Sequence, residues 1–427
     1  MQPAAVRAAS TRSPMIDRLL LWQPLVAAAY LALLPTNALT FWRSTTFALG
    51  ALLTLAVAMA AARHRAPAIP APPRAVTLAF VAWGLWSTAS LAWSVHPDYT
   101  AVQLRREVAW TLLAAATFFV ACSDGRTWRG FVVTALGGFV VLATVAGVQA
   151  LTVGRWNAGV WHGDVGLWST WLVLVAPFTL TLLAPPPGGF ADRRASLVGG
   201  VLLLALLLAA ARATDNRMVW IALAAVFATA SLLGALRWRA SLRRAPLRWL
   251  VPLLCLLVAL GALFADAVRE KAQQHYPPQT SVAQALATDP RIVLWDHTVE
   301  RIRERPWTGF GFGRGIIGDE LRAALRDPLL AHAHNVFVSQ WLQTGAPGFA
   351  LLVALLAALA TAYAGSLRST DPTRALLGVI GLSLLAGFVV KNLTDDFFFG
   401  SNAREFWALN AILLGYDARL RAATAAA

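Results

Sequence analysis

The stretch LVGGVLLLALLLAAARATDNRMVWIALAAVFATAS, residues 197–231, holds two long apolar runs separated by the short polar segment ATDN. Each run approaches the roughly 20 residues that an α-helix needs to cross a bilayer. The runs are continuous and rich in Leu and Ala, which favours membrane helices over the alternating strands of a β-barrel. Asp215 or Asn216 can cap the second helix, so that Arg217 lies near its start. The stretch therefore predicts a hairpin of two membrane-spanning helices.

The same pattern recurs along all 427 residues, which are 58% hydrophobic and 13% charged, compared with about 25% charge in soluble domains. Mean hydropathy is +0.60. Proline, glycine and charge clusters separate the apolar runs. We predict an all-α polytopic membrane protein with about 12 transmembrane helices, at residues 19–36, 45–62, 75–93, 106–122, 130–150, 166–184, 197–213, 217–235, 249–267, 347–365, 375–391 and 402–417.

The chain carries a net charge of +15. In a soluble protein this excess would suggest binding to nucleic acid, but arginines that flank membrane helices explain it here, so no nucleic-acid partner is expected. If the N-terminus is cytoplasmic, the short segments on that side carry clearly more arginine than those on the other side. This asymmetry predicts both termini inside. We therefore expect nine transmembrane helices within 1–267, a long outer loop at 268–346, and three helices with a cytoplasmic tail in 347–427.

The outer loop contains TDPRIVLWDHTVERIRERPWTGFGFGRG, residues 288–315. Thr288 or Asp289 can cap a helix, and Pro290 suits its first position. Pro306 would end this helix. Apolar residues recur at helical spacing along it, namely Ile292, Trp295, Val299 and Ile302. The segment predicts an amphipathic helix on the outer surface of the bundle.

The end of the loop reads AHAHNVFVSQWLQTGAPG, residues 331–348. Asn335 can cap a helix that stops at Gly345. His334 then precedes the helix N-terminus, where the helix dipole disfavours a charged imidazolium, and a neutral histidine can act as a general base. The alternative is an inert, hydrogen-bonded histidine at the membrane boundary. His332 lies two residues earlier, and we expect its replacement to have a milder effect.

Several arginines are predicted on the outer side, against the general charge asymmetry. Arg291 falls in the first turn of the loop helix, where a cation opposes the helix dipole, and such a local misfit suggests a functional constraint. Arg217 repeats this pattern, while Arg105 and Arg106 lie at the outer end of another span. Each one alone could be an interfacial arginine that reaches lipid headgroups. Together they predict a site for an anionic group such as phosphate.

Two weaker motifs lie nearby. GFGFGRG, residues 309–315, follows a predicted helix rather than a strand, so we interpret it as a turn-rich segment packed near the site and not as a nucleotide-binding loop. Asp395 and Asp396 are adjacent acids without the further oxygen ligands that a divalent metal needs. One of them could pair with an arginine instead. We expect neither a metal nor a cofactor.

Five segments, taken in order, resemble the O-antigen ligase and O-antigen polymerase superfamily over nearly the whole chain. They are ASLAWSVHPDYTAVQLRREVAW, DNRMVW, RIVLWDHTVERIRERPWTGFGFG, HNVFVSQWLQTGAPG and NLTDDFFFGSNAREFWALNAILLGY. The most specific part is His334-Asn335 followed by an apolar helix and Gly345. It is preceded by Arg291-x-x-x-Trp295 and by Gly309-x-Gly311.

The resemblance implies a glycosyltransferase of the bacterial inner membrane, with 268–346 as a periplasmic catalytic loop. Its donor would be a glycan on undecaprenyl pyrophosphate, and the reaction would need no metal. In the ligase branch the acceptor is the lipid A–core oligosaccharide. An acceptor hydroxyl would attack the anomeric carbon directly and invert it.

The resemblance also assigns residues. The family's essential histidine corresponds to His334, and its arginines correspond to Arg217 and Arg291. The usual pattern reads Ser-Arg where this chain has Asn216-Arg217, which leaves the role of the neighbour open. The residues expected to bind substrate are Arg105, Arg106, Asn335, Trp295, His332 and Asp395.

Three functions fit these features to different degrees. The late position of the long loop favours a ligase. A polymerase would use the same donor and differ in its acceptor. A flippase or transporter of lipid-linked glycans would need charges deep within several spans and broken helices near the midplane, whereas most charges here lie at span ends.

Overall fold

The computed structural model describes residues 14–63, 68–122, 124–153, 165–183, 193–214, 216–238, 246–273, 290–327 and 330–426. Within these ranges the regular secondary structure is entirely helical, as predicted. The long bundle helices are α1 (Pro14–Leu33), α2 (Thr40–Ala62), α3 (Arg74–Ala89), α5 (Trp110–Ala121), α6 (Gly125–Val153), α8 (Val165–Val175), α10 (Arg193–Arg212), α11 (Arg217–Arg237), α13 (Pro246–Gln273), α17 (Val336–Leu367), α18 (Pro372–Asn392) and α19 (Gly400–Ala426). Shorter elements are η1 (Ser90–Trp93), α4 (Pro97–Gln103), η2 (Leu104–Ala109), η3 (Ala176–Thr179), α9 (Leu180–Leu183), α15 (Pro290–Glu304) and α16 (Gly318–Leu325).

Nine helical segments in the described ranges are long and apolar enough to cross a membrane. They are α1, α2, α3 with η1, α6, α8 through α9, α10, α11, α17 and α18. The other three predicted spans coincide with α5, α13 and α19, so every predicted span overlaps a helix. The protein is therefore a multi-pass helical membrane protein.

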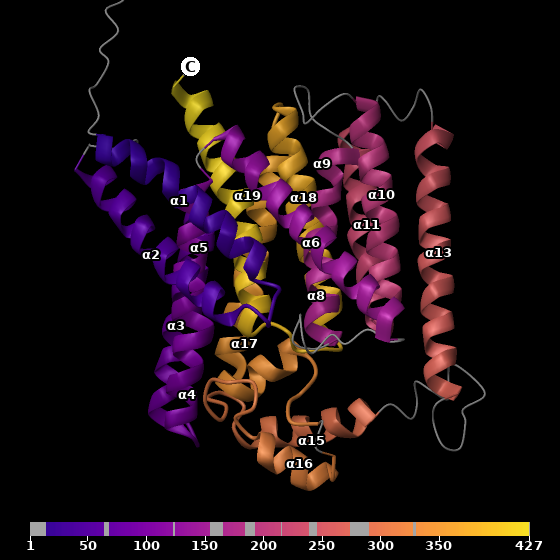
Figure 1. The fold of residues 1–427 in the computed structure, drawn as a ribbon. Coiled ribbons are helices and arrows are strands. Elements are labelled where there is room, and N and C mark those ends of the chain that lie inside the picture. Colours follow the sequence, from indigo (N-terminus) through magenta and orange to yellow (C-terminus); the bar gives the residue numbers. More distant parts are fainter. Residues whose placement is uncertain are drawn as a thin grey trace, which may run out of the picture.

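Figure 1 shows α4, α15 and α16 gathered at one end of the bundle, and the C-terminal end of α19 at the opposite end. We call the first of these the loop end. At the centre, α11 and α17 pack against α18, and α5 packs against α19. Large side chains that are fully buried fill the space between helices, among them Trp83, Trp168, Trp171, Trp220 and Phe388. Outward-facing apolar residues such as Leu52 and Leu202, each 65% exposed, suit contact with lipid.

The loop helix α15 begins at Pro290 and ends at Glu304, close to the predicted limits. Thr288 and Asp289, the predicted caps, lie outside the described residues. The predicted apolar stripe was only half right, because Ile292 and Val299 are exposed while Trp295 is partly buried and Ile302 is buried. The face that packs inward carries Leu294, Thr298 and Ile302, four residues apart. Contact with the bundle selects this face, and it includes a threonine that a search for apolar residues passes over.

The histidine segment leads into α17 as predicted. The Asn335 side-chain oxygen accepts hydrogen bonds from the backbone N–H groups of Phe337 at 2.9 Å and Val338 at 3.2 Å, so Asn335 caps the helix. The backbone leaves the helical conformation at Thr344 and Gly345, where Gly345 has φ 69°. This left-handed residue is the predicted stop, and the helix resumes directly after it.

The break in α17 is filled by the glycine-rich segment. Its backbone pairs with the broken helix: the Phe310 N–H donates to the Leu342 carbonyl at 3.0 Å, and the Gly311 N–H donates to the Gln343 carbonyl at 2.8 Å. A Cβ atom on Gly309 would lie 2.5 Å from the carbonyl carbon of Gln343. The two backbones meet without side chains between them, which only glycine allows here.

Three tryptophan indoles reinforce this junction by donating hydrogen bonds to backbone carbonyls. Trp86 reaches the Thr344 carbonyl at 2.8 Å, and Trp93 reaches the Thr308 carbonyl at 2.7 Å. Trp341 reaches the Pro306 carbonyl at 3.0 Å. Backbone carbonyls that the helix break and the loop leave without a partner thereby receive hydrogen bonds.

We predict that Gly345→Ala lowers the thermal unfolding temperature of the purified protein. The left-handed backbone alone costs an alanine about 1–3 kcal/mol, and its Cβ would lie 2.2 Å from the carbonyl of Trp307. The control is Gly130→Ala in α6, where a new Cβ meets no atom within 4 Å. This control should be neutral or slightly stabilising. Equal unfolding temperatures for the two variants would contradict the role given to the break.

Candidate functional site

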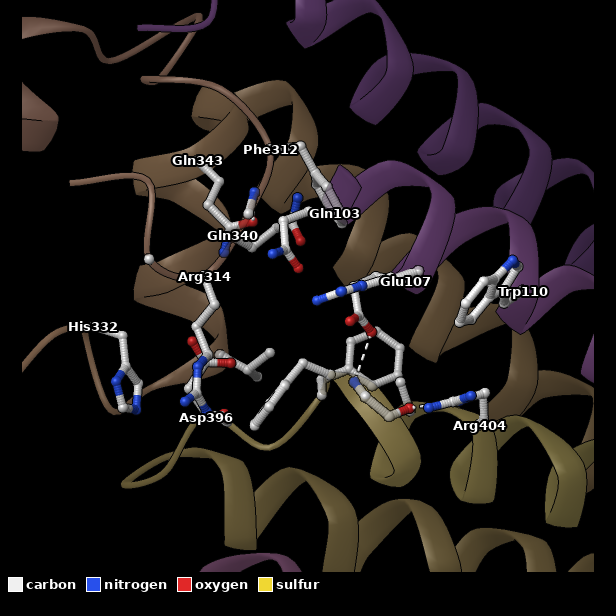
Figure 2. A pocket seen from close by; sticks show the side chains of 18 of the residues that line it. Gln103, Glu107, Trp110, Phe312, Arg314, His332, Gln340, Gln343, Asp396 and Arg404 are labelled. Atoms are coloured by element: carbon white, nitrogen blue, oxygen red, sulfur yellow. Dashed lines mark hydrogen bonds between the residues drawn. The ribbon is translucent and has the colours of Figure 1, made fainter. Parts of the chain in front are cut away.

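A cavity of about 620 Å³ lies at the loop end of the bundle. Its wall brings together α2, η2, the glycine-rich segment, the start of α17 and the residues that enter α19. Figure 2 shows His332, Arg314 and Asp396 on one side of this cavity, with Glu107, Trp110 and Arg404 on the other. Residues distant in sequence, from Thr40 to Arg404, thus share one chamber. We call the two sides the histidine end and the arginine end.

The two histidines of the motif lie against each other. Their ring centroids are 3.9 Å apart, and His332 lines the cavity with only 9% of its surface exposed. His334 adopts φ 48°, a left-handed conformation that is uncommon for a residue other than glycine. Such backbone strain is concentrated at functional sites in proteins. The sequence favoured His334 over His332 as the functional residue, whereas His332 is the one of the two that lines the cavity.

His334 faces a buried carboxylate. Its Nδ1 lies 4.0 Å from Oδ1 of Asp395, a distance that is too long for a hydrogen bond and leaves an electrostatic contact. Among the described residues, neither imidazole nitrogen of His334 has a hydrogen-bond partner, although both nitrogens are buried. Buried polar atoms are normally paired. The unsatisfied nitrogens therefore identify His334 as a candidate for contact with a ligand.

Asp395 connects three charged groups. It forms ion pairs with Lys391, which is fully buried, and with Arg291 at 3.4 Å. Burial by itself would raise the pKa of Asp395, but the Lys391 ammonium, His334 and the Arg291 guanidinium together hold it below its usual value. The pairing of an acid with an outer arginine, suggested by the sequence, is present. Asp395 is thus an anion at neutral pH and anchors Arg291 beside His334.

Trp295 and Asn335 hold the histidine segment in place. The Trp295 indole donates to the Ala333 carbonyl at 2.7 Å, and the Asn335 amide donates to the Leu393 carbonyl at 2.8 Å. Neither side chain lines the cavity. Both were predicted to bind substrate, and their observed contacts are with the protein's own backbone.

Arg314 and Asp396 complete the histidine end and were not assigned to the site from the sequence. An Arg314 Nη donates to the backbone carbonyl of Asp396 at 2.6 Å, and its guanidinium lies 3.7 Å from the centre of the Phe399 ring. Asp396 is 3% exposed, and burial raises its pKa. Its Oδ2 has no hydrogen-bond partner among the described residues. The one signal for Arg314 was its position in the glycine-rich segment.

The arginine end is built on η2, a stretch of π-helix, which is a conformation common at functional sites. Glu107 accepts a hydrogen bond from the Gly400 N–H at 2.7 Å, and Arg404 Nε donates to the Gly400 carbonyl at 2.9 Å. Arg106 lines the cavity, as does Arg43 from α2. Arg105 is exposed and is not part of the cavity wall.

Arg217 begins α11, and Asn216 caps this helix by accepting from the Met218 N–H at 3.0 Å. The Asn216 amide also donates to the Ser169 hydroxyl of α8 at 3.1 Å. Arg217 does not line the cavity. The structure therefore gathers four predicted residues in one cluster, namely His332, His334, Asp395 and Arg291. Of these four, only His332 lines the cavity, which Arg106 also lines; His334, Asp395 and Arg291 lie next to it, and Arg105 and Arg217 are outside its wall.

The fold and the site together define a multi-pass membrane protein with a cationic cavity and a buried histidine cluster at one end. A family model described as O-antigen ligase matches residues 202–353, which include α11, α15 and the histidine motif. This match confirms the predicted resemblance to the O-antigen ligase and O-antigen polymerase superfamily over this part of the chain. No curated protein matches the chain.

We predict that acid destabilises the protein through His332. Burial, the Arg314 guanidinium and His334 lower the pKa of His332 from 6.5 to about 2. Asp395 acts in the opposite direction, and Arg291 lowers the pKa further. As pH falls from 6.5 towards 2, the unfolded chain binds a proton that the folded protein excludes, so stability falls by up to about 1.4 kcal/mol per pH unit.

The measurement is the thermal unfolding temperature between pH 8 and pH 5 for the wild type and for His332→Gln. Below pH 6.5 the unfolding temperature of the variant should fall less than that of the wild type. His297→Gln is the control, because His297 is on α15 near Glu320 and away from the cavity. Identical pH profiles for the wild type and His332→Gln would contradict the prediction.

Proposed function

We propose that the protein is an O-antigen ligase, which transfers a glycan from undecaprenyl pyrophosphate to the lipid A–core oligosaccharide at the periplasmic face of the inner membrane. The observation that carries this proposal is His334, whose buried ring nitrogens have no hydrogen-bond partner among the described residues and which lies beside Asp395 next to a cationic cavity. The family match supports the same reaction class.

The proposed topology has twelve spans, which are the nine segments described above together with α5, α13 and α19. Both termini would be cytoplasmic, following the arginine asymmetry. The loop end would then face the periplasm, with 268–346 as the catalytic loop between the spans of 1–267 and those of 347–427. A donor lipid that stays in the bilayer would present its pyrophosphate at this level.

His334 would act as the general base. A hydroxyl of the acceptor attacks the anomeric carbon of the glycan while the bond from that carbon to the pyrophosphate oxygen breaks. The hydroxyl proton passes to an imidazole nitrogen of His334, and the bonding electrons leave with the pyrophosphate. Asp395 stabilises the resulting imidazolium through its negative charge. One displacement of this kind inverts the anomeric carbon.

The arginines would stabilise the leaving pyrophosphate. Arg291 is held within the cluster by Asp395 at 3.4 Å, and Arg314 adds a second cation at the histidine end. Arg217 is assigned by the family resemblance and lies at the start of α11. Fixed guanidinium groups are charged at every relevant pH, so they can neutralise a diphosphate without a metal ion.

The decisive experiment is reconstitution of the purified protein in vesicles with a lipid-linked glycan as donor. One set of vesicles contains lipid A–core, and a second set contains only further lipid-linked glycan. A ligase extends the lipid A–core, whereas a polymerase lengthens the lipid-linked glycan. Transfer to neither acceptor, with the protein folded and inserted, would refute the proposed function.

We predict that His334→Ala lowers the transfer rate about 10²–10⁴-fold, the usual effect of losing a general base. Folding and membrane insertion should persist. His297→Ala is the matched control, since this second histidine of the loop lies outside the cavity wall. A His334→Ala variant that transfers glycan at nearly the wild-type rate would show that the histidine is structural.

We predict that Arg291→Lys and Arg217→Lys each retain only part of the activity, and that alanine at either position removes it. A lysine supplies a point charge but lacks the planar fork that binds phosphate through two parallel hydrogen bonds. Arg303→Lys, at an exposed position of α15, serves as the control. Full activity of both lysine variants would show that charge alone is sufficient.

A further inference from the structure

The arginine end of the cavity takes no part in the proposed transfer step. It consists of Arg43, Arg106, Glu107, Trp110 and Arg404. Figure 2 shows Glu107, Trp110 and Arg404 across the open space from His332 and Arg314. A substrate that spans the cavity would contact both ends.

Three guanidinium groups line this end of the cavity with one carboxylate, that of Glu107, and the buried Glu405 lies outside the wall near Arg43 and Arg404. Arg43 donates to the Thr36 carbonyl at 2.7 Å, and Arg404 donates to the Gly400 carbonyl at 2.9 Å. Carbonyls fix these side chains without neutralising them, and Arg43 and Arg404 lie close enough to repel each other electrostatically. Glu107 uses one oxygen to bind the Gly400 N–H. The arrangement is pre-organised and carries excess positive charge, which suits an anion.

Arg106 is available to a ligand. It lines the cavity but makes no hydrogen bond or ion pair with any residue in the described part of the chain. The N-terminus of α19, a helix of 27 residues, lies in the same region, where the Gly400 N–H donates to Glu107. A helix N-terminus adds further positive potential.

The other wall residues suit a saccharide. Trp110 offers an aromatic face, near which the Arg404 guanidinium lies at 5.9 Å from the ring centre. Apolar C–H faces of sugar rings can pack on such a ring. Gln103, Gln340 and Ser44 provide amides and a hydroxyl for sugar hydroxyl groups. The ligand indicated is therefore a sugar that carries negative charge.

The arginine end lies at the level of the membrane that the sugars of a lipid-anchored molecule reach. Arg43 is in the first turn of α2, directly after Phe41 and Trp42, which are 71% and 58% exposed. Exposed aromatic residues at the end of a membrane helix mark the headgroup level. Sugars close to a lipid anchor lie at this level.

We infer that the arginine end binds a phosphate group carried by the acceptor saccharide. This inference rests on the proposed function and adds to it a subsite that recognises a negatively charged group on the acceptor. The donor pyrophosphate belongs at the histidine end, beside Arg291 and Arg314.

The test compares Arg106→Gln and Arg404→Gln with the wild type, using two acceptors in the reconstituted transfer. One acceptor is lipid A–core with its phosphates, and the other is the same molecule after phosphatase treatment. Arg106 makes no contact that the fold needs, so its variant should remain folded. Arg63→Gln is the matched control, because Arg63 ends α2 on the opposite side of the bundle.

With the phosphorylated acceptor, each variant should raise the acceptor KM about tenfold, the effect of losing one charge-assisted hydrogen bond. The donor KM should stay within about twofold of the wild-type value, and the treated acceptor should show no difference between variants and wild type. A raised donor KM would assign the arginine end to the donor pyrophosphate and overturn the inference. An equal effect on both acceptors would overturn it as well.

A second measurement does not depend on transfer. Calorimetric titration of the detergent-purified protein with deacylated, phosphorylated core oligosaccharide should show binding that Arg106→Gln weakens. The phosphatase-treated oligosaccharide should bind the two proteins equally. Equal binding of the phosphorylated form to wild type and variant would overturn the inference, even if the proposed transfer reaction proves wrong.

Discussion

The backbone contact between the glycine-rich segment and the break in α17 is the constraint on which the site depends. Gly309 and Gly345 allow two main chains to meet where any side chain would clash. The Gly311 N–H then pairs with a carbonyl of α17, and Arg314 follows three residues later in the cavity wall. A loop that would otherwise lie free over the bundle is thereby fixed against a membrane helix.

Electrostatics divides the cavity into two unlike ends. At the histidine end, Arg291 and Lys391 both pair with the carboxylate of Asp395, so ion pairs within the protein hold the cluster together. At the other end, guanidinium groups are fixed by carbonyls and keep their charge. Buried ions need partners or a ligand to offset the loss of water. The first end has such partners within the protein, whereas at the second end three arginines outnumber the two nearby carboxyl groups, Glu107 and Glu405.

The sequence predicted features that depend on neighbours along the chain. The spans, the start of α15 at Pro290, the cap at Asn335 and the stop at Gly345 all follow from local composition and turn chemistry. An ion pair between Asp395 or Asp396 and one of the outer arginines was also predicted, and the structure has it between Asp395 and Arg291. The predictions of spans, caps and helix ends succeeded because helix periodicity and capping have short-range signals.

Features that depend on how distant segments meet were missed. Arg314 lines the cavity because the loop inserts into α17, and Arg404 does so because α19 starts beside η2. The buried face of α15 was misjudged because Thr298 packs inward, where apolarity alone does not identify it. No pattern in a single sequence predicts that Arg43 of α2 and Arg404 of α19 line the same cavity.

The cavity size has a consequence for long substrates. A chamber of about 620 Å³ is comparable to the pockets that enclose drug-sized molecules. A polysaccharide of many repeat units cannot enter it, so only the sugars next to the reacting bond can be enclosed. Under the proposed function, the protein would contact only the end of a polymer, and the length distribution of its products would be set by the polymer supplied to it.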